Sequence, residues 1–287
     1  MITRFDHTVI AVSDLDRAVD AYRSLGFEVF PGGRHEHRGT HNALIRFGGL
    51  DYVELLGVYD AERAVESGPN GRALAEFVDG RDGGLVGHCY ATDDIEGEAA
   101  RAREAGIEMV GPFEMRRARP DGHTITWRLT VPVDVPWRRR WPFIIQWDDP
   151  DEERRAVEGV GVHGNTAGAV VGVSVAVRDL REATGLYSAL FGSGPRSTGE
   201  VPDLAATRAS FEVRGFGIDL LAPAGDGPVG EALARDGEGP FEARIRVEDL
   251  AAARALVPGA EEDDGGLRVP ADRALGARLR LIQDRPT

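Results

Sequence analysis

Four polar side chains stand among apolar neighbours in segments with the alternating, β-branched pattern of strands: His7, Glu54, His88 and Gln146. Burying one such group without a partner costs about 1–3 kcal/mol. A divalent cation shared by all four would satisfy them together. Imidazole, carboxylate and amide donors suit Zn, Ni, Co, Mn or Fe(II). We therefore expect one metal ion, with open coordination positions left for water or a substrate.

Each of the four residues also has an ordinary structural explanation. A single histidine on a strand is commonly a hydrogen-bonded core residue, Glu54 could pair with Arg46, and Gln146 could bond to the backbone. The joint pattern, at equivalent places in two repeated units, favours the metal. Cys89, the only cysteine, follows His88 and is expected to be a small buried hydrophobe.

The elements that would position these residues follow from an internal repeat. The segment from Val12 to Tyr22 returns without a gap as the segment from Val177 to Tyr187, and weaker copies begin at Ala91 and Arg246. Each copy reads as an apolar strand, an acidic N-cap and an amphipathic helix, with further strands after it. We expect an α+β fold of four tandem βαβββ units, near residues 2–60, 84–149, 168–223 and 239–285.

The four units would pair into two halves. Residues 1–149 are expected to form a domain with the metal site, 150–167 a linker, and 168–287 a second, degenerate half. Paired units curl their sheets around a shared cavity, into which every second strand residue points. In the second half Gly172 takes the place of His7, and neither first strand keeps a histidine. We expect that half to be scaffold, dimer surface or cavity wall.

With these units in place, the chain resembles the vicinal-oxygen-chelate (VOC) superfamily, and its first half resembles the glyoxalase-like domain. The resemblance covers about residues 4–149 and rests on Phe5-Asp6-His7-Thr8, Gly39-Thr40-His41-Asn42, Tyr52-Val53-Glu54-Leu55 and Phe143-Ile144-Ile145-Gln146-Trp147. It implies the fold shared by glyoxalases, bleomycin-resistance proteins and dioxygenases, and a divalent metal on inward strand positions. His7, Glu54, His88 and Gln146 match the four ligand positions of that family.

The activity expected on this basis is that of a metal-dependent isomerase, epimerase or lyase, acting on a small carbonyl or carboxylate substrate. The metal would stabilise an enolate, and Glu54 would be the catalytic residue that moves the proton. Candidates for contact with the substrate are His41, Asn42, Tyr52, Tyr90, Arg128, Arg138 and Arg139. The arginines belong to a basic cluster that also holds Arg116, Arg117 and Arg119, and would capture an anionic substrate; the alternative is a solvated face paired with surplus acids.

Two other functions of the same superfamily stay open, because its members differ widely in activity. His7, His88 and Glu54 alone would make the two-histidine, one-carboxylate site of an Fe(II)-dependent dioxygenase. A non-catalytic, resistance-type binding protein would instead have an empty metal site and a roomy apolar cavity, lined by Trp127 and Trp147.

Composition argues against several other classes of function. The net charge of −14 argues against nucleic acid as a partner, and no run of about 18 apolar residues would cross a membrane. One cysteine and no apolar signal region favour a cytoplasmic protein. Neither a phosphate-binding loop, a dinucleotide fingerprint nor a serine nucleophile motif is present. The expected partner is a small-molecule substrate, and a homodimer is left open.

Overall fold

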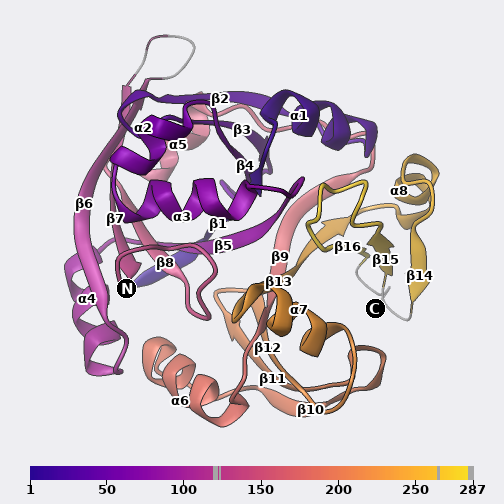
Figure 1. Ribbon diagram of the computed structural model, residues 1–287. Coiled ribbons are helices and arrows are strands. Elements are labelled where there is room, and N and C mark those ends of the chain that lie inside the picture. Colours follow the sequence, from indigo (N-terminus) through magenta and orange to yellow (C-terminus); the bar gives the residue numbers. More distant parts are fainter. Residues whose placement is uncertain (119–121, 123, 264–265, 284–287) are drawn as a thin grey trace.

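The computed structural model describes residues 1–118, 122, 124–263 and 266–283, and folds into two eight-stranded sheets (Figure 1). The strands of the first sheet lie in the order β2-β3-β4-β1-β5-β8-β7-β6, and those of the second in the order β10-β11-β12-β9-β13-β16-β15-β14. The two orders are the same once the second is shifted by eight strands. The predicted α+β fold of tandem βαβββ units is therefore confirmed.

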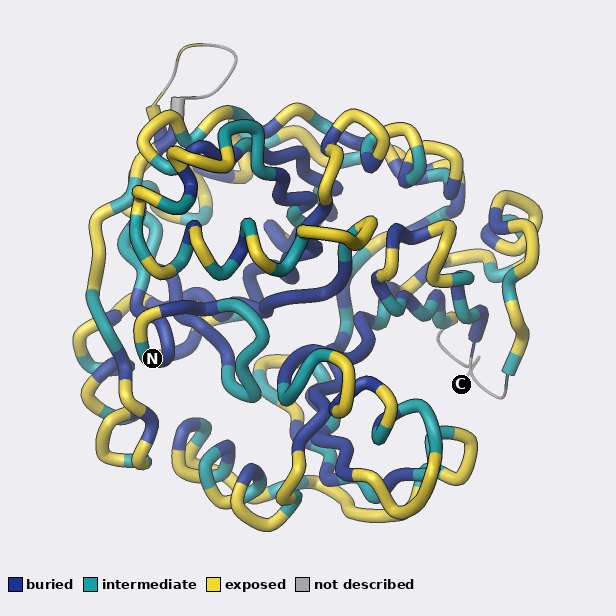
Figure 2. The backbone as a smooth tube through the Cα atoms, viewed as in Figure 1, coloured by how far each residue is buried: buried dark blue, intermediate teal, exposed yellow. Residues whose placement is uncertain are grey.

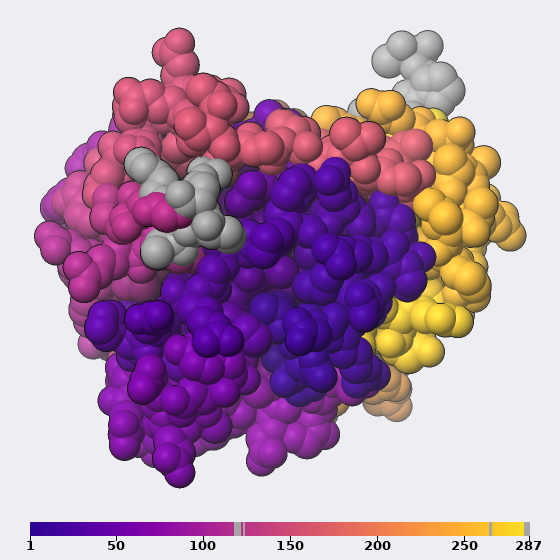
Figure 3. Space-filling model, turned by 90° about the horizontal axis from the view of Figure 1, so that it is seen from above, coloured from indigo at the N-terminus to yellow at the C-terminus, as the bar shows by residue number. Residues whose placement is uncertain are grey.

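The first half contains β1 (Ile2–Val12), α1 (Leu15–Ser24), β2 (Phe30–His35), the short 3₁₀ helix η1 (Glu36–Arg38), β3 (Thr40–Arg46), β4 (Tyr52–Val58), α2 (Ala61–Glu66), α3 (Pro69–Val78), β5 (Gly83–Thr92), α4 (Ile95–Glu104), β6 (Met109–Ala118), β7 (Thr124–Pro132) and β8 (Phe143–Trp147). The helix α5 (Asp151–Val157) follows. Its Arg154 lies with the guanidinium carbon 3.7 Å from the ring centre of Trp147. Seen from above, the chain beyond β8 runs across the first half toward the second (Figure 3).

The second half contains β9 (Ala167–Ala176), α6 (Leu180–Phe191), β10 (Ser197–Val201), the 3₁₀ helix η2 (Pro202–Leu204), β11 (Ala206–Val213), β12 (Phe216–Pro223), α7 (Pro228–Asp236), β13 (Gly239–Val247), α8 (Leu250–Leu256), β14 (Glu261–Asp263), β15 (Gly266–Val269) and β16 (Leu279–Ile282). The acidic residue before each main repeat helix caps it. Asp14, Asp94, Asp179 and Asp249 each accept a hydrogen bond from a backbone N–H in the first turn.

The two halves share one hydrophobic core, centred on the paired strands β1 and β5, which Figure 2 shows as buried. Phe5 stacks on Phe216 of the second half with ring centres 3.8 Å apart. Tyr22 donates a hydrogen bond to the carbonyl of Ala274. Because one contact is apolar, the other is a hydrogen bond and both are buried, the halves form one packed body. No helix in the described part of the chain is long and apolar enough to cross a membrane.

Candidate functional site

The first sheet curls around a cavity whose walls come from alternate residues of its strands. Because strand side chains alternate between faces, β6, β7 and β8 each present every second side chain to it. The apolar part of the lining includes Leu56, Leu74, Phe113, Met115, Trp127, Leu129, Val131, Pro136, Trp137, Phe143, Ile145 and Trp147. The cavity leaves about 110 Å³ for the centres of water-sized molecules. That is room for several waters or for a small ligand.

One wall of the cavity is polar and is built around His7 and Glu54. The Nε2 atom of His7, on β1, lies 3.8 Å from Oε2 of Glu54, on β4. The ring of Tyr52 stacks on the imidazole with centres 4.5 Å apart. Asn42 donates a hydrogen bond of 2.6 Å to the other carboxylate oxygen, Oε1, and accepts one from Arg117. Glu54 therefore has one oxygen held by Asn42 and the other turned toward His7.

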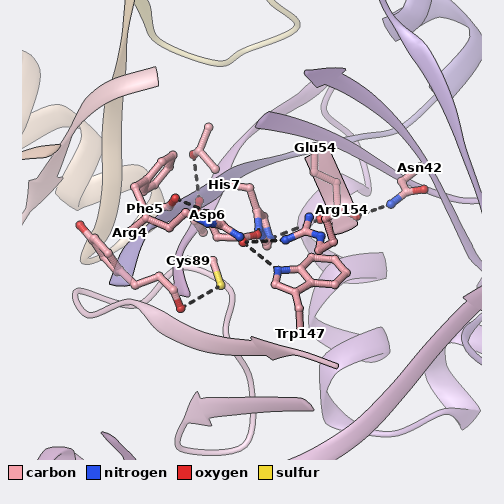
Figure 4. Close-up of polar contacts among 12 residues, drawn as sticks. Arg4, Phe5, Asp6, His7, Asn42, Glu54, Cys89, Trp147 and Arg154 are labelled. Atoms are coloured by element: carbon pink, nitrogen blue, oxygen red, sulfur yellow. Dashed lines mark hydrogen bonds and ion pairs between the residues drawn. The ribbon is translucent and has the colours of Figure 1, made fainter. Parts of the chain in front are cut away.

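Asp6 binds the ring nitrogen of His7 that does not face Glu54, and Figure 4 shows its carboxylate among several hydrogen-bond donors. Oδ1 of Asp6 lies 2.6 Å from Nδ1 of His7, and Oδ2 accepts hydrogen bonds from Arg4 and from Nε1 of Trp147. Burial would raise the pKa of Asp6, but the charges of Arg4 and Arg154 and the bond to His7 hold the pKa well below its usual range. An ionised Asp6 accepts the proton of Nδ1, which leaves the Nε2 lone pair facing Glu54.

The structure does not bring His88 and Gln146 to this site. His88 lies on the opposite face of β5, where its Nε2 is 3.4 Å from the hydroxyl of Tyr187 in the second half. Burial lowers the pKa of His88 to about 3, so its imidazole is neutral there. Gln146 accepts a hydrogen bond from the backbone N–H of Ile95, at the start of α4. The expectation that four side chains share one centre is thus not met.

The local geometry of β1 and β8 accounts for this difference. The pairing of β1 with β5 is irregular between Phe5 and His7, so Cys89 lies opposite His7 and His88 lies opposite Thr8. Such an irregularity changes which face a side chain takes. On β8 the side chains of Phe143, Ile145 and Trp147 line the cavity, and Gln146 between them points to the outer face.

The residues expected to contact a substrate divide in the same way. Asn42 and Tyr52 line the cavity, whereas His41 faces away, with its ring edge on Tyr59. Tyr90 lies with His88 in the core between the halves. The expected arginines lie elsewhere. Arg128 pairs with Glu96 on α4, and Arg138 donates to the carbonyls of Leu85 on β5 and of Pro240 in the second half. Arg139 lines a separate hollow with Arg178. Arg119 lies outside the described residues.

The sequence model of the family described as "Glyoxalase-like domain" matches residues 5–191. The chain belongs to this family. The glyoxalase-like family is part of the VOC superfamily, as the resemblance implied.

Relatives and solved structures agree with this assignment. A protein described as ethylmalonyl-CoA/methylmalonyl-CoA epimerase from Cereibacter sphaeroides is 30% identical over 116 residues, which make up 40% of this chain and 79% of the epimerase. A hypothetical protein from Staphylococcus aureus has a TM-score of 0.67 at 18% identity, over 98% of this chain and 99% of that one. A mutant of 4-hydroxymandelate synthase from Streptomyces coelicolor has a TM-score of 0.66 at 16% identity, over 100% and 94%. The two structures show that the whole chain, second half included, has this fold.

Membership of the glyoxalase-like family implies a divalent metal, and the donors in the cavity test that implication. His7 and Glu54 offer one nitrogen and one oxygen, from β1 and β4. At the corresponding places β5 offers the buried thiol of Cys89, whose pKa burial raises well above its usual range, and β8 offers apolar side chains. Among the described residues no group of three or more His, Cys, Asp or Glu side chains is arranged to hold a metal. The cavity therefore does not fit the expected four-ligand site.

The second half of this glyoxalase-like protein has different side chains at the positions that correspond to His7 and Glu54. Arg244, opposite Gly172 across β13 and β9, forms an ion pair with Asp219 and donates to Ser174. A Cβ atom at Gly172 would lie 2.3 Å from Nη2 of Arg244, so a side chain at that position would require the guanidinium group of Arg244 to move. Gln283 repeats the role of Gln146, because it accepts from the backbone N–H at the start of α8.

Several residues of the site were not among the substrate contacts expected from the sequence. Asp6 orients His7, and His35 and Arg38 contribute nitrogen atoms to the cavity wall. Arg117, which also lines the cavity, was named only as a member of the basic cluster. A signal was present for Arg117, since it alternates with Phe113 and Met115 along β6. The two tryptophans expected in a binding protein, Trp127 and Trp147, do line the cavity.

Proposed function

We propose that the first half binds a small, largely apolar molecule and exchanges a proton on it between His7 and Glu54. The observation that carries this proposal is the approach of two proton acceptors, Nε2 of His7 and Oε2 of Glu54, at the polar wall of an otherwise apolar cavity. Apolar walls exclude water and strengthen the electrostatic interactions of a bound ligand. Either group can accept a proton from a ligand atom placed between them.

The surroundings of each acceptor support separate roles. Asp6 stabilises the imidazolium that forms when His7 takes up a proton, since its carboxylate already holds Nδ1. Asn42 occupies one oxygen of Glu54, so that proton transfer takes place at the other. Tyr52, stacked on the imidazole, keeps the ring in this orientation. The relative described as an epimerase is consistent with this chemistry, because inverting a carbon centre requires removal and return of a proton.

A second candidate is the metal-dependent isomerase, epimerase or lyase expected from the sequence. It is favoured by His7 and Glu54, which face each other from β1 and β4, the strands on which that prediction placed two of its ligands. It would need further donors from the ligand or from water. Elemental analysis of the purified protein, with His7→Ala as the control, separates the two. Stoichiometric metal that is lost in the variant supports the second candidate, and metal near zero in both contradicts it.

Proton exchange can be tested before the natural substrate is known. A panel of aryl- and alkyl-substituted ketones, carboxylic acids and thioesters is incubated in deuterated water with the wild type, His7→Gln and Glu54→Gln. Proton NMR follows loss of the signal from the carbon next to the carbonyl. We expect exchange of at least one compound by the wild type and a rate lower by a factor of about 100 in each variant. If compounds of the panel bind to the wild type and none of them exchanges, the protein is a binding module and proton transfer is contradicted.

A further inference from the structure

The cavity wall contains two guanidinium groups with few acceptors around them. Arg117, on β6, is 8% exposed and donates to the amide oxygen of Asn42, and its Nε has no acceptor among the described residues. Arg38, at the end of η1, donates to the sulfur of Met115. A thioether is a weak acceptor and carries no charge. Among the described residues, no carboxylate lies within ion-pair distance of Arg38 or Arg117.

The two arginines lie on the same side of the cavity as the polar pair. Met115, which Arg38 contacts, and Arg117 are alternate residues of β6 and therefore face the same way. His35 lines the same cavity, and the charges of Glu54, Arg117 and Arg38 all act on its pKa. An anionic group held by Arg38 and Arg117 would thus be bound next to Glu54 and His7.

The charges of the lining do not balance. Arg38 and Arg117 contribute two positive charges and Glu54 one negative charge. Burial lowers the pKa of His35 to about 4, so its imidazole is neutral at pH 7. Asp6, behind His7, is already paired with Arg4 and lies near Arg154. One positive charge is left over in a largely apolar cavity, which is costly unless a ligand compensates it.

We propose that the ligand of this cavity carries a single carboxylate, bound by Arg38 and Arg117, with its apolar remainder against the tryptophans. Guanidinium groups bind carboxylates and phosphates through paired hydrogen bonds. A carboxylate is favoured over a phosphate because the excess is one charge and a phosphate dianion would exceed it. This inference rests on the proposed function, in that the cavity must bind a small molecule, and it names the class: apolar monocarboxylic acids.

Matched probes test the assignment. Phenylacetate and phenylacetamide have nearly the same shape and differ in charge, and benzylphosphonate supplies the phosphate-like alternative. Binding is measured by quenching of tryptophan fluorescence and by calorimetry on the full chain. We expect phenylacetate to bind the wild type at least tenfold more tightly than the amide, about 1.4 kcal/mol. Arg38→Met and Arg117→Met should abolish this preference while the affinity for the amide stays within about twofold.

The control and the outcomes keep the two proposals apart. Arg116→Met changes an exposed arginine one residue from Arg117 and should leave the preference intact. Because Arg117 is buried, thermal unfolding is recorded for each variant, and Arg38→Met alone decides if Arg117→Met does not fold. Equal affinity for phenylacetate and phenylacetamide would overturn the carboxylate assignment, but it would still show that the cavity binds small molecules. Tighter binding of benzylphosphonate would overturn it in favour of phosphate. Binding of none of the three would contradict both this inference and the proposed function.

Discussion

Glu54 lies with Oε2 3.8 Å from Nε2 of His7, and each side chain is held from behind by a different partner. Asp6 binds the far nitrogen of the imidazole, and Asn42 binds the far oxygen of the carboxylate. The two facing atoms are therefore oriented toward each other before any ligand arrives. Such preorganisation is the main contribution that a protein makes to proton transfer.

Glu54→Gln should lower the rate of proton exchange by a factor of about 100 or more, because the amide cannot take up the proton. The fold should be kept, since the amide oxygen can still accept the bond from Asn42. The rate is measured by NMR in deuterated water and the fold by thermal unfolding. Glu96→Gln, which changes an exposed carboxylate on α4, is the control. An unchanged rate in Glu54→Gln would exclude this residue from proton transfer.

Asp6→Asn should destabilise the protein by about 3–5 kcal/mol, because it leaves the buried cations Arg4 and Arg154 without their central anion. The free energy of unfolding is obtained from urea denaturation. Asp151→Asn removes the outer partner of Arg4, a carboxylate that is 37% exposed, and should cost at most about 1 kcal/mol. Equal losses in the two variants would show that Asp6 has no special position.

The repeat in the sequence was enough to predict the fold. The start of each repeat helix is set by a local interaction, the hydrogen bond from a backbone N–H to the acidic cap. Residues such as Asp14 and Asp179 therefore mark the helix starts in the sequence itself. His7 and Glu54 could be placed on one wall because β1 and β4 run parallel in regular register from His7 onward. The side of the sheet that each residue takes follows there from simple alternation.

The positions of the other two predicted ligands, His88 and Gln146, depended on strand geometry that residue types do not reveal. The irregular pairing between Phe5 and His7 places Cys89, in place of His88, opposite His7 and on the same face of the sheet. The strand around Gln146 is apolar on both faces, so alternation could not show which side is inward. Asp6 was not predicted as a partner of His7, because consecutive residues of a regular strand point to opposite faces. The irregular pairing between Phe5 and His7 allows the two side chains to meet.

His88 should make the protein sensitive to mild acid. Burial lowers its pKa to about 3, against 6.5 in an unfolded chain, so only the unfolded state binds the proton between these values. This stabilisation is present above pH 6.5 and is lost as the pH falls toward about 3. In His88→Gln the free energy of unfolding should fall less steeply with decreasing pH, by up to about 1.4 kcal/mol per unit. The same slope in both proteins would contradict a buried, neutral His88.

Asp51 should lower the stability of the protein as the pH rises, which is the opposite of the effect of His88. Burial raises its pKa to about 6 from 3.8, although its carboxylate accepts a hydrogen bond from the backbone of Val170. The folded state then holds the proton more tightly, so this contribution is complete below pH 3.8 and is lost as the pH rises through about 6. Asp51→Asn keeps an acceptor and should be more stable than the wild type by about 1–3 kcal/mol at pH 7. Urea denaturation at pH 4 and pH 7 checks this, and a gain of equal size at both would refute it.

Nitrogen NMR of the histidine rings tests most directly whether a ligand reaches the pair of His7 and Glu54. The ¹⁵N-labelled protein is titrated with phenylacetate, and the signals of His7 and His88 are assigned with His7→Gln and His88→Gln. The account predicts that the Nε2 signal of His7 moves in proportion to ligand bound while both nitrogens of His88 stay in place. Saturable binding that leaves His7 unchanged, or that moves His88 instead, would contradict it.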